Sequence, residues 1–173
     1  CIRLYDETEF AGRPRFTDPE ILRIIEADPQ AALDPVAAVA AAALERGIPC
    51  HVDACIGGWV LPFLDDVPPW TFAVPGVTSI SIDLHKYAYT PKGVSLLLHR
   101  DSSLRKGHFF ASADWPGYTM LNSTMQSTKS GGPLAAAWAV GQWIGVEGYG
   151  ALAVRARGAA LEIARRAPGI PGV

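Results

Sequence analysis

The spacing of hydrophobic residues divides the chain into short segments, most of them bounded by glycine, proline or aspartate. An alanine-rich segment, residues 36–46, starts after Asp34-Pro35 and stops before Gly47, a composition that predicts a helix. Apolar residues at helical spacing predict a shorter helix over residues 20–27. Similar spacing predicts two further helices towards the end of the chain, over residues 134–144 and 152–166.

Three segments between these helices are predicted to be strands. Residues 48–54 lead into a Gly-Gly turn, residues 77–83 alternate in part between apolar and polar, and residues 94–98 form a compact apolar run. This succession of helix, strand and glycine-rich turn is typical of an α/β protein, with helices flanking a mostly parallel sheet. Because residues 94–98 follow the preceding strand too closely for a helical crossover, we expect these two strands to be antiparallel.

Composition and charge exclude several classes of function. The chain has 173 residues, of which 49% are hydrophobic and 18% charged, so one domain with a sizeable core is expected. A net charge of −2 argues against a nucleic-acid partner, because proteins that bind the phosphate backbone carry a basic excess. The longest apolar run, residues 36–44, is much shorter than the roughly 20 residues of a membrane span. We therefore expect no transmembrane segment.

The three cysteines, Cys1, Cys50 and Cys55, are an odd number in a chain of ordinary size. This number favours a reducing, cytoplasmic location over a disulfide scaffold, with Cys50 and Cys55 as small buried residues. The first ten residues lack the apolar stretch of a signal peptide. The chain also begins without methionine, which suggests a fragment or a processed product.

Two polar clusters lie at the C-terminal ends of predicted strands, the edge where open α/β sheets bind ligands. The clusters are His51, Asp53 and Cys55 at the end of the first strand, and Asp83, His85 and Lys86 at the end of the second. Taken alone, these residues leave several interpretations open. His51, Asp53 and His85 could hold a metal ion, Asp53 could cap the following turn, and Lys86 could be an ordinary surface lysine. The glycine-rich nucleotide-binding motifs and the serine-hydrolase motif are absent from the sequence.

Two longer strings resemble the pyridoxal-phosphate-dependent group II decarboxylases. They are His51-Val-Asp-Ala-Cys-Ile-Gly-Gly-Trp59 and Ser79-Ile-Ser-Ile-Asp-Leu-His-Lys-Tyr-Ala-Tyr-Thr-Pro-Lys-Gly93. Asp114-Trp-Pro-Gly117 and Ser127-Thr-Lys-Ser-Gly-Gly-Pro133 continue the resemblance, which runs from about Asp34 to the end. Within the family, the strings are most similar to members that cleave a phosphorylated sphingoid base. The resemblance implies that residues 34–173 are part of a pyridoxal-phosphate-binding large domain of fold type I, the aspartate-aminotransferase-like fold, and it leaves residues 1–33 unassigned.

The resemblance also implies a role for each matching residue. Lys86 would bind the cofactor aldehyde covalently and act as a base once a substrate has displaced it. Asp53 would pair with the pyridine nitrogen and keep it protonated, so that the ring can accept electrons. The small side chain of Ala54 would let the ring lie close to the strand end. His85 would contact the cofactor phosphate or the substrate.

A loop near the end of the match implies a second subunit. In the family this loop reaches the phosphate of the neighbouring subunit's cofactor, so Thr128 and Ser130 become candidate phosphate ligands in a homodimer. Lys129 stands where we expect arginine in relatives, and an ordinary Gly/Ser loop is the alternative interpretation. The Trp-bearing helix at residues 134–144 could serve the dimer contact or the core.

The chain departs from the family in what surrounds these residues. Neither the Ser/Gly-rich phosphate cup nor the side chain that stacks on the cofactor ring is recognisable before Asp34, and the small C-terminal domain is missing. We therefore expect these 173 residues to hold the cofactor weakly. The expected function is a carbon–carbon lyase that acts on a small amine substrate by a retro-aldol step. The alternatives are an amino-acid decarboxylase and a non-catalytic fragment or partner subunit.

Overall fold

The computed structural model of the chain describes residues 2–4, 33–124 and 128–169. These residues form two compact units, each assembled from three stretches of the chain. The first unit comprises Cys1–Asp53, Pro69–Ser81 and Leu97–Gly131, and the second comprises Ala54–Pro68, Ile82–Leu96 and Gly132–Val173. The helix expected at residues 20–27 and the candidate loop residue Ser127 lie outside the described residues.

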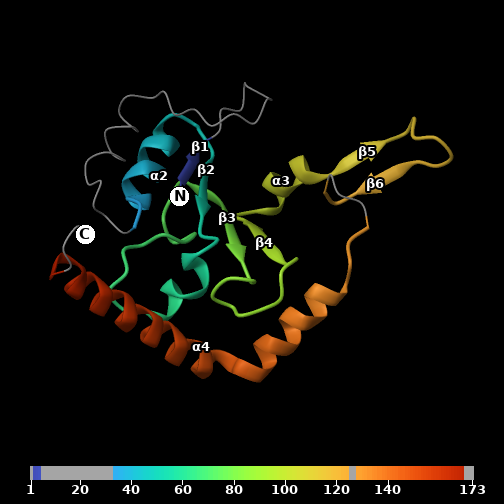
Figure 1. The fold of residues 1–173 in the computed structure, drawn as a ribbon. Helices are drawn as coiled ribbons and strands as arrows, with labels where there is room; N and C mark the ends of the chain where they lie inside the picture. Colours follow the sequence, from blue (N-terminus) through green and yellow to red (C-terminus); the bar gives the residue numbers. More distant parts are fainter. Residues whose placement is uncertain (1, 5–32, 125–127, 170–173) are drawn as a thin grey trace. The chain divides into compact units, whose positions relative to one another are not determined.

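A four-stranded sheet, ordered β1-β2-β3-β4, carries the two predicted polar clusters (Figure 1). Its strands are β1 (Ile2–Leu4), β2 (Cys50–Asp53), β3 (Val77–Asp83) and β4 (Ser95–His99). β1 and β2 pair antiparallel, whereas β2 and β3 pair parallel. The Leu84 N–H bonds to the Val94 carbonyl and the Arg100 N–H to the Thr78 carbonyl, so residue numbers run in opposite directions along β3 and β4. The predicted antiparallel pairing is therefore confirmed, and β1 is a strand that the sequence did not predict.

The predicted alanine-rich helix is present as α2 (Val36–Glu45), one residue shorter than expected. Its buried face includes Val39, Ala40 and Ala43 and packs against β2 in the first unit. Gly47 follows the helix with φ of 63°, in the left-handed region that glycine adopts most easily. The composition of this segment thus predicted both the helix and its end.

Gly76, just before β3, allows a close approach between the chain and α2. Its φ is 92°, and a Cβ at this position would lie 2.3 Å from the Ala40 carbonyl oxygen. We therefore expect Gly76→Ala to destabilise the chain by about 1–2 kcal/mol from backbone strain alone, and by further energy from the clash. Gly117 has the same φ but open space around it, so Gly117→Ala is the matched control. Equal losses in urea unfolding of the two variants would contradict a role for the close approach.

The rest of the first unit contains elements that the sequence did not predict. Helix α3 (Ser102–Arg105) is capped by Asp101, whose carboxylate accepts hydrogen bonds from the Ser103 and Leu104 N–H groups. Two short strands follow, β5 (Phe110–Ser112) and β6 (Met120–Asn122), and pair antiparallel. Neither strand is predictable from the sequence, because three residues are too few for a clear alternation of apolar and polar positions.

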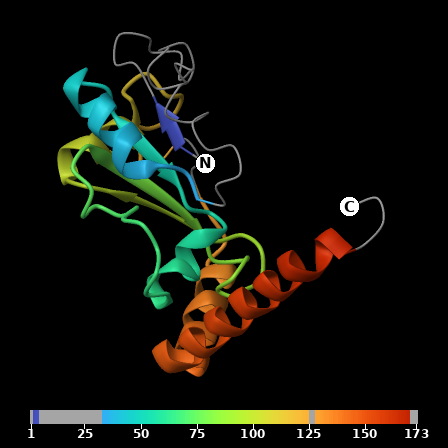
Figure 2. The same cartoon turned by 90° about the vertical axis from the view of Figure 1, so that its left-hand side faces the viewer.

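The second unit is built around α4 (Gly132–Arg166), which bends sharply at Gly145, where φ is 66° (Figure 2). The sequence predicted two helices with a gap between them; instead, residues 146–151 are also helical and the break is a single glycine. A core cluster in this unit contains Leu84, Ala88, Val94, Ala137 and Tyr149. Trp59 and Phe63, from the short 3₁₀ segments Gly57–Trp59 and Leu61–Phe63, pack against this cluster. Within the described ranges, no helix is both long and apolar enough to span a membrane.

Candidate functional site

The first polar cluster lies on one face of the parallel pair β2–β3. His51 is in register with Ser79, and Asp53 with Ser81. Alternate residues of a strand point to opposite faces, and the residues between them, including Val52 and Ile80, are buried. Apolar packing on one side of this strand pair therefore fixes a row of polar side chains on the other.

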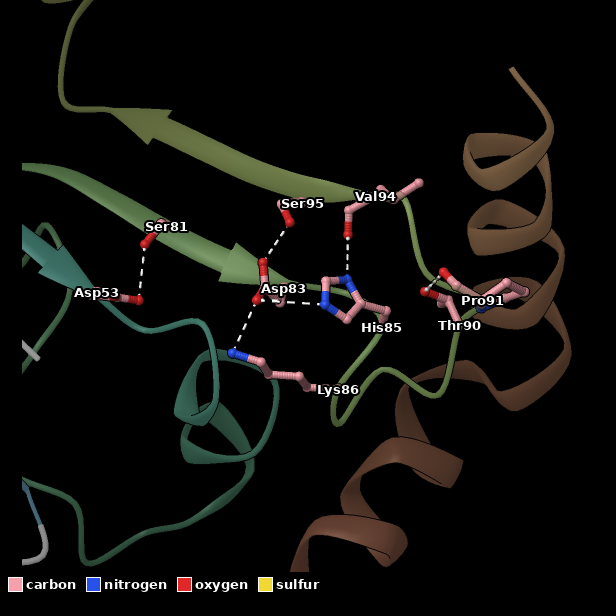
Figure 3. Close-up of polar contacts among 9 residues, drawn as sticks. All are labelled: Asp53, Ser81, Asp83, His85, Lys86, Thr90, Pro91, Val94 and Ser95. Carbon is pink, nitrogen blue, oxygen red and sulfur yellow. Dashed lines mark hydrogen bonds and ion pairs between the residues drawn. The ribbon is translucent and has the colours of Figure 1, made fainter. Parts of the chain in front are cut away.

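These polar side chains are joined by hydrogen bonds. Nδ1 of His51 lies 2.8 Å from Oγ of Ser79, and Nε2 lies 3.2 Å from Oγ of Ser81. The Ser81 hydroxyl donates to Oδ1 of Asp53 at 3.2 Å (Figure 3). The carboxylate at the end of β2 is thus linked to the imidazole through a serine on the neighbouring strand.

The second cluster lies at the end of β3, in the second unit, and is centred on Asp83. Its Oδ2 lies 3.0 Å from Nζ of Lys86 and 3.7 Å from Nε2 of His85 (Figure 3). Ser95 on β4 donates a short hydrogen bond to Oδ1 of the same carboxylate. His85 is also held from its other side, because its Nδ1 lies 3.4 Å from the Val94 carbonyl oxygen, which can only accept.

The contacts of Asp83 favour its ionised form. The Ser95 hydrogen bond is the main cause, followed by the contact with Lys86, and together they lower the pKa of the Asp83 carboxyl despite partial burial. A carboxyl whose pKa is lower in the folded than in the unfolded chain stabilises the fold above its unfolded pKa. This stabilisation is lost as the pH falls through the lowered pKa. Asp83 is therefore a fixed negative charge beside Lys86 throughout the neutral range.

The loop that carries Lys86 is held in an uncommon conformation. Tyr89 has φ of 58°, the one positive φ among the described non-glycine residues, and its N–H bonds to the Lys86 carbonyl at 3.1 Å. The hydroxyl of Tyr149, on α4, donates to the Ala88 carbonyl at 3.0 Å in the buried core of this unit. Burial also raises the pKa of Tyr149, so its hydroxyl remains a donor. Tertiary contacts therefore constrain the backbone on the C-terminal side of Lys86.

The remaining predicted residues lie in different surroundings. Ala54, next to Asp53 in the chain, is buried, and its role beside a cofactor ring stays a prediction. Thr128 and Ser130 are exposed, and their role as phosphate ligands stays a prediction. Cys50 is fully buried, which raises the pKa of its thiol to about 11, whereas Cys55 is half-buried.

Two further expectations from the sequence are a site shared by Asp53 and Lys86 and, as an alternative, a metal site. Asp53 belongs to the first unit and Lys86 to the second, so their joint action in one site stays a prediction. Across residues 33–124 and 128–169, no group of three His, Cys, Asp or Glu side chains is arranged to hold a metal ion. The alternative metal site of His51, Asp53 and His85 is not such a group.

Four side chains that hold the two clusters or the Lys86 loop in place were not predicted from the sequence. Ser79 and Ser81 bond to the first cluster, Ser95 bonds to Asp83, and Tyr149 holds the Lys86 loop. The two serines on β3 had a detectable signal, since Ser-x-Ser-x-Asp alternates along a strand next to His-x-Asp. Tyr149 had none, because it lies more than sixty residues from the loop that it contacts.

Comparison with known proteins identifies the relatives of the chain. No family model matches it. The chain is 42% identical over 125 residues to the sphingosine-1-phosphate lyase of Arabidopsis thaliana, and 40% identical over 126 residues to that of Rattus norvegicus. A probable L-tyrosine/L-aspartate decarboxylase of Methanospirillum hungatei is 38% identical over 122 residues. These matches cover 69–70% of this chain but only 23%, 22% and 32% of the respective relatives.

Solved structures agree with the sequence matches. The sphingosine-1-phosphate lyase of Burkholderia pseudomallei superposes with a TM-score of 0.76 at 40% identity, over 83% of this chain and 34% of that one. Glutamate decarboxylase of Lactobacillus brevis has the same fold, with a TM-score of 0.57 at 24% identity over 69% and 29% of the two chains. The expected partial large domain of fold type I is therefore confirmed. In sequence and in fold, the chain is similar to a segment of the sphingosine-1-phosphate lyases, and its sequence is also similar to part of a probable L-tyrosine/L-aspartate decarboxylase.

Proposed function

We propose that this chain is the cofactor-binding segment of a pyridoxal-phosphate-dependent carbon–carbon lyase. The observation that carries the proposal is the arrangement of Lys86, in a constrained loop with its ammonium 3.0 Å from a carboxylate oxygen. The loop is also anchored in the core, because the Tyr149 hydroxyl donates to the Ala88 carbonyl two residues after Lys86. The similarity to sphingosine-1-phosphate lyases supports the same assignment.

The residues present suit this cofactor chemically. Pyridoxal phosphate has an aldehyde that reacts with an amine, a pyridine nitrogen that an acid can keep protonated, and an anionic phosphate. Lys86 supplies the amine, and Asp53 supplies a carboxylate that a serine hydrogen bond holds in place. His85, which donates to the Val94 carbonyl at 3.4 Å, is a candidate contact for the phosphate or the substrate. When bound, the cofactor supplies an electron sink for the breaking carbon–carbon bond.

The roles of the side chains follow from their contacts. Lys86 would hold the cofactor through its amine, and the same amine, when free, would take up a proton. Asp83 stabilises the resulting ammonium through the contact at 3.0 Å, and Ser95 keeps that carboxylate aimed at Lys86. Asp53 holds the proton of the pyridine nitrogen, and Ala54 leaves room for the ring.

The proposed substrate is a phosphorylated sphingoid base, which a retro-aldol step would cleave into an aldehyde and phosphoethanolamine. Thr128 and Ser130 would bind the phosphate of a second subunit's cofactor, so a homodimer forms part of the proposal. A cytoplasmic location fits the thiols of Cys50 and Cys55, which are not joined in a disulfide. The chain spans about a third or less of the length of its relatives. The proposal therefore includes further residues, outside this chain, that complete the cofactor-binding site.

Amino-acid decarboxylation is the second candidate function. It is favoured by the 38% identity to a probable L-tyrosine/L-aspartate decarboxylase. The two reactions use the same lysine and the same electron sink, and they differ in which bond of the substrate is aligned for cleavage. A non-catalytic partner subunit is the third candidate.

Product analysis separates these candidates. The chain is incubated with pyridoxal phosphate and either sphingosine 1-phosphate or L-tyrosine and L-aspartate, and aldehyde and carbon dioxide are measured. We expect aldehyde from the sphingoid base and no carbon dioxide, at a low rate because the chain spans about a third or less of its relatives. Carbon dioxide without aldehyde would support the decarboxylase instead. Cofactor bound at Lys86 with neither product would support the non-catalytic partner.

A further inference from the structure

We propose that Ser79, His51 and Ser81 form a hydrogen-bonded relay, named here the β2–β3 relay, that positions Asp53 as an ionised carboxylate. The importance of Asp53 rests on the proposed function, but the relay itself is a property of the chain without cofactor. Its members are positioning residues, since they act on the cofactor only through Asp53. Neither their hydrogen bonds nor their order follows from the sequence similarity.

The register of the two strands creates the relay. Parallel pairing sets the Cα atoms of His51 and Ser79 opposite each other, and likewise those of Asp53 and Ser81. His51 can therefore contact the serine across from it and also the serine two residues further along β3. The distances are 2.8 Å from Nδ1 to Ser79 and 3.2 Å from Nε2 to Ser81. A shift of one residue in register would turn the serines to the other face of the sheet.

Proton counting fixes the direction of these bonds. An ionised carboxylate only accepts, so the single proton of the Ser81 hydroxyl must point to Oδ1 of Asp53, at 3.2 Å. The Ser81 oxygen then has only lone pairs to offer His51, so Nε2 of His51 must carry a proton. In the neutral imidazole Nδ1 is consequently the acceptor, and the Ser79 hydroxyl donates to it. Every donor in the relay points towards Asp53.

The direction of hydrogen-bond donation determines which nitrogen of His51 can take up a second proton. A second proton on the imidazole can enter only at Nδ1, next to Ser79, whose hydroxyl can rotate and accept instead of donating. The Nε2–H bond to Ser81 and the Ser81 bond to Asp53 are the same in both protonation states. Asp53 therefore keeps its hydrogen-bond donor whether His51 is neutral or charged.

The surroundings support a fixed arrangement of this kind. Val52 and Ile80, on the opposite face of the same strands, are buried at 5% and 3% exposure and hold the two strands together. The Thr78 hydroxyl donates to the Cys50 carbonyl at 2.8 Å, a further link between β2 and β3. On the other side of β2, Arg3 of β1 is the charged residue whose Cα is in register with His51.

Nitrogen-15 NMR of the four histidines tests the relay in the chain without cofactor. We expect the His51 imidazole to show a protonated Nε2 and an unprotonated Nδ1 at pH above its titration. In Asp53→Asn the charged acceptor of Ser81 is lost, so the His51 resonances should shift. Asp65→Asn, an exposed aspartate elsewhere in the chain, should leave them unchanged. Two results would overturn the proposal: a proton on Nδ1 in the neutral wild-type imidazole, or His51 resonances at the same positions in wild type and in Asp53→Asn.

Two serine variants extend the test, each measured with Asp53 and with Asp53→Asn. Ser81→Ala breaks the relay and should remove the response of His51 to Asp53→Asn, whereas Ser81→Thr retains the hydroxyl and should restore it. If Ser81→Ala leaves the coupling intact, the relay does not exist. Failure of the proposed function is a separate result: it is seen as an absence of borohydride-fixed pyridoxal phosphate on Lys86, which the NMR measurement does not involve.

Discussion

Replacing Lys86 by arginine is expected to abolish covalent attachment of pyridoxal phosphate to the chain. A guanidinium group remains protonated at all accessible pH values and cannot react with the cofactor aldehyde as an amine does. The positive charge beside Asp83 is kept, so the fold of the second unit should be retained. Wild-type protein treated with pyridoxal phosphate and then borohydride should carry one pyridoxyl group, mapped by mass spectrometry to Lys86. Lys86→Arg should carry none above background, and any lyase activity should fall by at least about 10²–10⁴-fold, the typical contribution of a proton-transferring group.

The chain contains four lysines, and one of them provides a close control. Lys92 is an exposed residue of the same connection between β3 and β4, six positions further along. Lys92→Arg should leave the amount and position of the pyridoxyl label unchanged. Label distributed over several lysines in the wild-type chain, or label that persists undiminished in Lys86→Arg, would contradict the assignment of Lys86.

The parts of the fold that could be predicted from the sequence are those specified by neighbouring residues. Helix α2 was predictable because an Asp-Pro start, ten residues rich in alanine and a terminal glycine all lie within fifteen positions. β3 was predicted with its observed bounds, and β4 within one residue. β1 could not be predicted, because three residues beside Cys50–Asp53 form a strand only through a partner almost fifty residues away. The single break at Gly145 was likewise hidden, since glycine is compatible with both a kink and a loop.

The candidate site was predictable to a similar extent. Asp53, His85 and Lys86 were identified from motifs, since each lies within a string of adjacent residues. The groups that hold them in place come from other segments: Ser81 from the strand next to β2, Ser95 from β4 and Tyr149 from α4. Such contacts depend on strand register and tertiary packing, which a single sequence does not specify. A sequence motif can therefore indicate which side chains react, while the side chains that position them require the structure.

Asp53→Asn is expected to leave the attachment of pyridoxal phosphate to Lys86 largely intact and to lower product formation by about 10²–10³-fold. Attachment depends on the lysine amine, which Asp53 does not supply, whereas catalysis depends on a carboxylate that keeps the pyridine nitrogen protonated. An asparagine of the same size can accept the Ser81 hydrogen bond but carries no negative charge, so the polar contact is kept and only the electrostatic effect is lost.

The measurement compares two numbers for each variant: the amount of borohydride-fixed label on Lys86 and the rate of aldehyde release. Asp65→Asn removes an exposed carboxylate from the second unit and should change neither. If Asp53→Asn lowered both numbers equally, Asp53 would act in binding rather than in catalysis. If it lowered neither, the two polar clusters would not serve one cofactor. Only a loss confined to the rate supports a catalytic role for Asp53, because an effect on the pyridine nitrogen changes the reaction of the bound cofactor and not its attachment to Lys86.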